Sequence, residues 1–315
     1  MSEHVEMIRE GASPVVSLEP IRPPTPSTWK RARRSLVRAR WPILALNILA
    51  IVALAAIFGP EIAPRDPNRQ ALTSRLRPPM QQNVVNEIEH ILGTDGLGRD
   101  VLSRLIYGAR VSLMVGLTAV MIGGTLGTVL GMVGGYFGGI TDDIIGRLAD
   151  IQLAFPFILL AIMVLVVLGP GVPNLVLVLG IGQWVTYARI ARAETIAQRE
   201  KEYVEAARSI GQRDRAIVFK TILPNIFAPI IVIASFNVAS VILAEASLSF
   251  LGLGVPPTVP TWGGMLAESR DQLLAGAWWL AVFPGLAIML TVLSLNILGD
   301  WLRDFLDPRL RGRDR

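Results

Sequence analysis

Six long apolar runs dominate this sequence and restrict how it can fold. They cover residues 42–58, 111–135, 144–168, 174–190, 225–248 and 278–298. A helix of about 20 such residues crosses the roughly 30 Å hydrocarbon core of a bilayer. Because lipid offers no hydrogen bonds to the backbone, segments that cross it must be helical. The sequence therefore predicts an all-α, polytopic membrane protein with about six transmembrane helices.

The charged residues support a membrane location because they are few and clustered. They make up 17% of the 315 residues, whereas a soluble domain has about 25%. The net charge of +5 could serve nucleic acid, but six basic residues between 30 and 40 directly precede the first apolar run. Such a cluster is typical of a cytoplasmic anchor. We therefore expect membrane lipid as a partner and no nucleic acid.

The positive charges also predict the orientation. If both termini are cytoplasmic, segments 1–41, 189–220 and 301–315 lie inside, with eight, eight and five Lys or Arg residues. The outer segment 251–277 then holds Arg270 as its one basic residue. Because cytoplasmic segments are enriched in Lys and Arg, this distribution favours both termini inside.

Glycines in the second apolar run repeat every four residues, at positions 123, 127, 131 and 135. Such a stripe lets another helix approach closely, because packing drives helix association in lipid. Two interpretations fit the stripe. The simpler is packing within this chain, and the other is contact with a second subunit.

Polar residues inside the apolar runs should face protein or water, because they are costly in lipid. Gln183, Asn237 and Glu245 are of this kind. Each can join helices or line a translocation path, and for Glu245 we favour the joining role. Outside the runs, Asp95, Arg99 and Asp100 can form a local ion-pair and capping cluster or contact an external binding protein. We favour the structural role for these three as well, because exposed ion pairs are commonplace.

The sequence offers no catalytic or metal site. It has no cysteine, and His4 and His90 lie outside the apolar runs, where we expect ordinary solvated side chains. It also lacks the G-x-x-x-x-G-K-[ST] loop that holds nucleotide phosphates. We therefore expect a chain that is not an enzyme and that binds no ATP itself.

The most informative segment follows the fourth run. Tyr203, Ala206, Ala207 and Ile210 fall at i, i+3, i+4 and i+7, so one face of a helix here is apolar and mostly small. Gly211 follows, where a helix can end in a left-handed turn. A helix lying on the membrane would use larger apolar residues. We therefore expect Ala206 and Ala207 to form a surface that a partner protein approaches closely.

This segment closely resembles the EAA loop of bacterial ABC importer membrane subunits. The match rests on Glu205-Ala206-Ala207, Gly211 and Leu223-Pro224, whereas Thr221 stands where the family often has isoleucine. In that family the loop forms short helices that sit in a cleft of the ATP-binding subunit. The resemblance implies that the ATPase-coupling residues are Tyr203, Glu205, Ala206, Ala207, Arg208, Gly211, Leu223 and Pro224.

Other segments resemble the C-type subunit of the dipeptide/oligopeptide permease family. They lie at 93–113, 245–254 and 300–309, so the resemblance covers roughly residues 42–310. It implies a type I ABC importer permease fold and a multi-pass location in the bacterial cytoplasmic membrane. The implied partners are two ATP-binding subunits, a second homologous permease subunit and an extracytoplasmic substrate-binding protein. ATP and Mg would be bound by those partner subunits, with no cofactor on this chain.

The apolar runs and charges, together with the resemblance, divide the chain into parts. We expect a cytoplasmic tail at 1–41, a first transmembrane helix at 42–59, an extracytoplasmic loop at 60–106, a permease core at 107–304 with a coupling loop at 199–224, and a cytoplasmic tail at 305–315.

Other functions fit less well. An ion-driven secondary transporter often shows inverted repeats, of which we find none, and neither it nor a non-transporting scaffold or receptor needs an EAA-type loop. The closer alternative concerns the substrate. We expect dipeptides or oligopeptides, but relatives that import nickel or another small solute share every motif described above.

Overall fold

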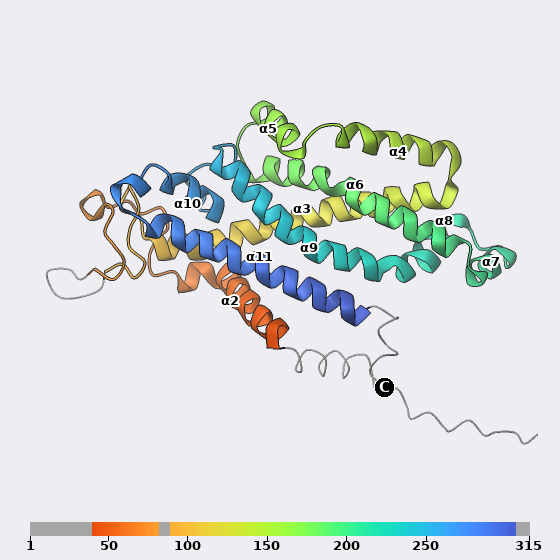
Figure 1. The fold of residues 1–315 in the computed structure, drawn as a ribbon, viewed down its shortest axis with the longest axis horizontal. Helices are drawn as coiled ribbons and strands as arrows, with labels where there is room; N and C mark the ends of the chain where they lie inside the picture. Colours follow the sequence, from red (N-terminus) through yellow and green to blue (C-terminus); the bar gives the residue numbers. More distant parts are fainter. Residues whose placement is uncertain (1–39, 82–88, 307–315) are drawn as a thin grey trace, which may run out of the picture. The chain divides into compact units, whose positions relative to one another are not determined.

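The computed structural model describes residues 40–81 and 89–306, and these residues form helices joined by turns and loops. In chain order the helices are α2 (Arg40–Ile62), η1 (Leu72–Ser74), α3 (Val101–Phe137), α4 (Gly139–Leu153), α5 (Phe157–Leu168), α6 (Val172–Arg199), α7 (Glu202–Ser209), α8 (Asp214–Ala216), the π-helical η2 (Ile217–Ile222), α9 (Leu223–Phe250), α10 (Trp262–Ser269), η3 (Leu273–Ala275) and α11 (Trp279–Leu306). Within the described ranges there is no strand, only an isolated bridge between Thr94 and Asp100. The all-α prediction is confirmed (Figure 1). Most of both predicted tails, and His4, lie outside the described residues.

Four helical segments are long and apolar enough to cross a membrane. They are α2, α3, the continuous segment Asp214–Phe250 and α11. The pair α4 and α5 passes the same test together, although it bends by 85° at the break between them. The sequence predicts about six spans, and the difference is α6, which contains the fourth apolar run but does not pass. Because neighbouring helices bury much of α6, it needs fewer apolar side chains than a helix surrounded by lipid.

The glycine stripe of α3 packs against α6 of the same chain, which decides between the two interpretations of that stripe. A Cβ atom added to any of three glycines would overlap a backbone carbonyl oxygen of α6. The pairs are Gly123 with Gly180, Gly127 with Trp184 and Gly131 with Ala188. Both series advance by four residues in the same direction, so α3 and α6 run parallel with their backbones in contact.

The parallel course of α3 and α6 bears on the topology. Two parallel helices require the chain to return between them, and α4 with α5 makes that return. The third apolar run was expected to be one helix, and the structure corrects this expectation. Pro156 lacks an N–H group and disfavours helical geometry at Phe155, so the helix breaks there and α5 starts in a new direction. α6 lies along α3, but by length and composition the candidate spans number four, or five with the bent pair, so a sixth crossing by α6 stays a prediction.

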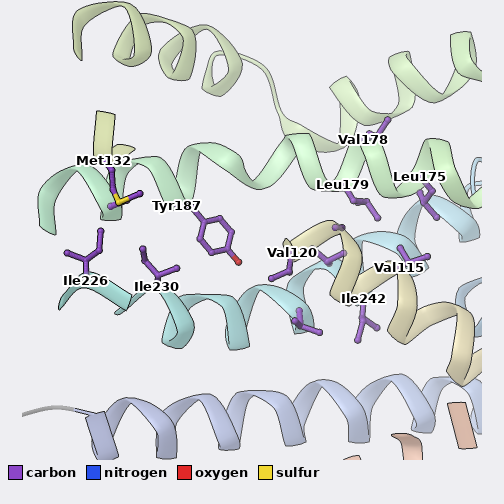
Figure 2. Close-up of a cluster of buried hydrophobic side chains, with 14 of the residues drawn as sticks. Val115, Val120, Met132, Leu175, Val178, Leu179, Tyr187, Ile226, Ile230 and Ile242 are labelled. Carbon is purple, nitrogen blue, oxygen red and sulfur yellow. The ribbon is translucent and has the colours of Figure 1, made fainter. Parts of the chain in front are cut away.

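A shared apolar core lies between α3, α6 and α9 (Figure 2). Its buried side chains include Val115, Val120 and Met132 from α3, Leu175, Leu179 and Tyr187 from α6, and Ile226, Ile230 and Ile242 from α9. The same core continues into the coupling loop through Val204, Ala207 and Ile217. The loop is therefore packed onto the membrane helices by burial of apolar side chains.

Candidate functional site

The coupling loop forms two short helices, α7 and α8, on the two sides of a glycine turn. Gly211 adopts the left-handed conformation that the sequence predicts, with φ at +75°. Its N–H donates to the carbonyl of Arg208 (2.9 Å), and the N–H of Gln212 donates to the carbonyl of Ala207 (3.1 Å). These two bonds form a Schellman motif. A Cβ at Gly211 would meet nothing within 4 Å, so the backbone conformation, and not crowding, favours glycine.

The two faces of α7 differ from the expected arrangement. Val204 is fully buried and Ala207 is 7% exposed, so both side chains face this chain's own core. Tyr203, Ala206 and Ile210 lie on the outer side, where Ile210 is 83% exposed. The sequence analysis placed Ala207 on the outer face together with Ala206. In so short a helix, a residue at position i+4 is compatible with either face. The structure corrects this: Ala206 is open to a partner, and Ala207 is not.

Polar contacts also define the outer side of α7. The Tyr203 hydroxyl donates to Oε1 of Gln198 (2.7 Å) at the end of α6. Partial burial raises the pKa of the Tyr203 phenol above its usual value. Glu205 and Arg208 are both exposed. The guanidinium group of Arg208 lies over the ring of Tyr136, at the end of α3.

The helical segment after the glycine turn does not stop at Pro224. It continues from Asp214 into α9 through a π-helical stretch, Ile217–Ile222. Because Pro224 has no N–H to donate to the preceding turn, the ordinary helical ladder cannot continue unchanged there. Leu223 is half-buried and Pro224 is exposed. The part of the coupling loop from Asp214 onward and α9 therefore form one continuous rod, whereas α7 is separated from it by the Gly211 turn.

The three polar residues inside the apolar runs lie at separate places. Glu245 is fully buried in α9 and accepts a hydrogen bond at Oε1 from Ser249 Oγ (2.8 Å). Its neighbour Ala246 lies against Gly263 of α10. Asn237 and Gln183 are half-buried, and no hydrogen bond joins these three side chains among the described residues. Burial of Glu245 in a helix contact supports the joining role, while lining of a translocation path stays a prediction for all three.

A cluster of four charges, three of them buried and Glu268 partly exposed, ties the loop before α3 to α10. Asp95 Oδ2 accepts from Arg99 Nε (2.6 Å) and Arg104 Nη1 (2.6 Å). The same two guanidinium groups donate to Glu268 of α10 (2.6 and 2.5 Å). The sequence singled out Asp95 and Arg99 but missed Arg104 and Glu268. Glu268 lies more than 160 residues further along the chain, so no local pattern could have indicated it.

Asp100 has a different role, as the cap of α3. Its Oδ2 accepts from the N–H of Ser103 (2.8 Å) and from Ser103 Oγ (2.7 Å). Its Oδ1 lies 2.9 Å from Nδ1 of His90. The expectation that His90 is solvated is wrong, because the ring is 5% exposed and packed against this carboxylate. The bonds of Asp95, Arg99 and Asp100 within the chain favour their structural role.

Comparison with known proteins decides the family. Residues 127–312 match the family described as "Binding-protein-dependent transport system inner membrane component". The chain belongs to this family. Residues 27–79 also match the "N-terminal TM domain of oligopeptide transport permease C". Members of this inner membrane family are the permease subunits of ABC importers, which work with ATPase subunits. The predicted family and membrane location are thereby confirmed.

Individual relatives are similar in sequence to most of the permease chain. It is 42% identical over 278 residues to a putative peptide transport system permease protein of Brucella suis, covering 88% of this chain and 91% of the relative. It is 41% identical over 286 residues to the di/tripeptide transport system permease protein DppC of Pseudomonas aeruginosa, covering 91% and 94%. A glutathione transport system permease protein of Escherichia coli is 40% identical over 301 residues, covering 96% of each chain.

A solved structure supports the fold. A chain of the MetNI methionine ABC transporter, determined in inward-facing conformations, superposes with a TM-score of 0.53 at 18% identity. The match covers 65% of this permease and 97% of that chain. The type I ABC permease fold is therefore confirmed.

Proposed function

We propose that this permease forms one membrane half of an importer for short peptides and couples to two ATPases through the outer face of α7. The observation that carries this proposal is the exposed apolar face of Tyr203, Ala206 and Ile210 on a helix whose other side is buried in the core. The chain itself then holds no nucleotide and is not an enzyme. ATP and Mg are bound by the ATPase subunits.

The chemistry of the outer face fits docking into a protein cleft. Ile210 presents nearly its whole side chain, and the small side chain of Ala206 lets a partner's surface come close to the α7 backbone. Glu205 and Arg208 flank this face with opposite charges that can fix the orientation of a partner. Gly211 sets the turn to α8, and Leu223 and Pro224 connect the loop to α9.

The substrate class follows from the relatives. The three described above are named for peptides, di/tripeptides and glutathione, which is itself a tripeptide. The shared chemistry of these substrates is a short peptide. Nickel or another small solute is the alternative, and it is an outcome of the substrate test that closes the Discussion.

The proposal includes the remaining partners and the topology. A second, homologous permease subunit completes the pathway, and an extracytoplasmic binding protein delivers the peptide. Both termini lie in the cytoplasm, on the same side as α7, because the segments at 1–41, 189–220 and 301–315 are the basic ones.

Site-directed cross-linking tests the docking face. The chain has no cysteine, so Ala206→Cys and Ala207→Cys each introduce a single thiol. In the assembled transporter, Ala206→Cys is expected to form a disulfide with a cysteine placed in the ATPase cleft. Ala207→Cys, one residue away but facing the core, is the matched control and should react far less. Equal reaction at both positions, or none at Ala206→Cys with any cleft position, would contradict the proposed face.

A further inference from the structure

Tyr136 lies in the last turn of α3, directly beneath the coupling loop. The residue is 6% exposed, and its ring packs edge-on against Phe137 at a centroid distance of 5.1 Å. No feature of the docking motif includes it. Its neighbours, however, are the parts of the chain that carry that motif.

Three segments of the loop region meet at this one residue. The Tyr136 hydroxyl donates to Oδ1 of Asp214 at the start of α8 (2.6 Å). The guanidinium of Arg208, in α7, lies over the ring at 5.3 Å from its centroid. Arg199, at the end of α6, donates from Nη1 to the backbone carbonyls of Tyr136 (3.1 Å) and Gly135 (3.3 Å). The ring therefore contacts both short helices, while its backbone is held from α6.

These contacts are directional, whereas the apolar contacts of the loop with the core are not. Val204 and Ala207 hold α7 by apolar packing, which tolerates small changes in angle. Within the described ranges, the other side-chain hydrogen bonds of α7 and α8 go to residues between 198 and 221. Tyr136 is thus the described residue outside this region whose side chain binds both helices, one on each side of the Gly211 turn.

We propose that Tyr136 is a positioning residue that fixes the angle between α7 and α8 and transmits movement of the docked loop to α3. This inference rests on the proposed docking function of α7. A push on α7 or α8 reaches α3 through the Tyr136 ring and hydroxyl. Because the glycines of α3 lie against carbonyl oxygens of α6, α3 cannot slide freely over α6, and the two helices move together. The loop then drives the bundle through α3 as well as through the α9 rod.

The test removes the hydroxyl and keeps the ring. Tyr136→Phe preserves the contact with Arg208 but leaves Asp214 without its donor. A hydrogen bond to a charged group changes an equilibrium by about tenfold or more. In the permease embedded in nanodiscs without ATPases, we therefore expect amide hydrogen exchange across residues 202–216 to rise about tenfold. In the complete reconstituted transporter, peptide imported per ATP hydrolysed should fall several-fold, with the subunits still assembled.

Matched variants separate this role from general damage. Tyr107→Phe makes the same chemical change at the other end of α3, where the described chain shows no hydrogen bond of that hydroxyl, and should leave both readings unchanged. Asp214→Ala, at an exposed position, should reproduce the Tyr136→Phe effect. The double variant should be no worse than either single one, because all three changes break the same bond.

Several outcomes would overturn the inference. One is unchanged exchange and unchanged import per ATP in Tyr136→Phe; another is additive losses in the double variant. If Tyr136→Phe fails to assemble, unchanged exchange and unchanged import per ATP in Asp214→Ala overturn the inference. The exchange measurement involves no ATPase, so it can fail while the docking face is correct. Conversely, a failed cross-link at Ala206→Cys would reject the docking face and leave the exchange result standing.

Discussion

Gly127→Ala is expected to lower the free energy of unfolding of this permease in detergent micelles by about 3 kcal/mol, the upper part of the usual range for overpacked contacts. The added methyl group would overlap the carbonyl oxygen of Trp184 and would lie 2.7 Å from Cβ of Tyr187 and 3.0 Å from the backbone nitrogen of Ala188. None of these atoms can move by a change of rotamer. The helices α3 and α6 must therefore separate along their whole contact, and the midpoint of a denaturing detergent titration should fall accordingly.

Gly124→Ala is the matched control for this prediction. Gly124 lies on the same helix, three residues away, and its Cβ would lie 3.4 Å from the Tyr187 ring, an ordinary contact. Because alanine favours helix over glycine by about 1 kcal/mol, this variant should be neutral or slightly more stable. If both variants unfold at the same detergent concentration, the backbone contact between α3 and α6 does not have the importance given to it here.

Asp95→Ala is expected to cost about 3 to 5 kcal/mol of unfolding free energy, the loss usual when one partner of a buried ion pair is removed. The side chains of Arg99 and Arg104 are 6% and 2% exposed, and Asp95 binds both. Its Oδ1 also accepts from the backbone N–H groups of Leu97 and Arg99, both at 2.9 Å. After the substitution, Glu268 alone would face two buried guanidinium groups. The loop before α3 and α10 should then separate, which limited proteolysis would detect.

Asp271→Ala removes the same charge from the same side of the molecule. Asp271 is exposed, and its side chain makes no ion pair within the described ranges, so the change should stay within about 0.5 kcal/mol. A similar protease sensitivity for Asp95→Ala and Asp271→Ala would show that the four-charge cluster is not what holds α10 in place.

The sequence predicted correctly those features that depend on residues close together in the chain. Apolar runs long enough to cross a bilayer located α2, α3, α9 and α11. The spacing of Gly123 and Gly127 predicted a close helix contact, although not which helix makes it. Gly211 was recognised as a helix end because the left-handed residue that ends a helix is usually glycine. Each of these conclusions depends on residues within a few turns of one another.

The rest depends on contacts that the chain makes over long distances. The burial of His90 follows from its contact with Asp100, and the cluster of Arg104 requires Glu268 from a distant helix. The inner side of α7 was misassigned because Ala207 fits an apolar stripe on either face until the core beneath it is known. The bend at Pro156 divided one hydropathy peak into two helices. α6 was predicted as a span from hydropathy alone, whereas in the structure its most evident feature is close packing against α3.

The central claim is that this permease serves an ATP-driven importer of short peptides. The most direct measurement is ATP hydrolysis by the complete transporter in proteoliposomes, with its ATPases, second permease subunit and binding protein, as di- and tripeptides or nickel are added. The account predicts that peptides stimulate hydrolysis several-fold and accumulate inside, whereas nickel does neither. Stimulation by nickel or a nickel chelate, with no response to any peptide, would contradict it.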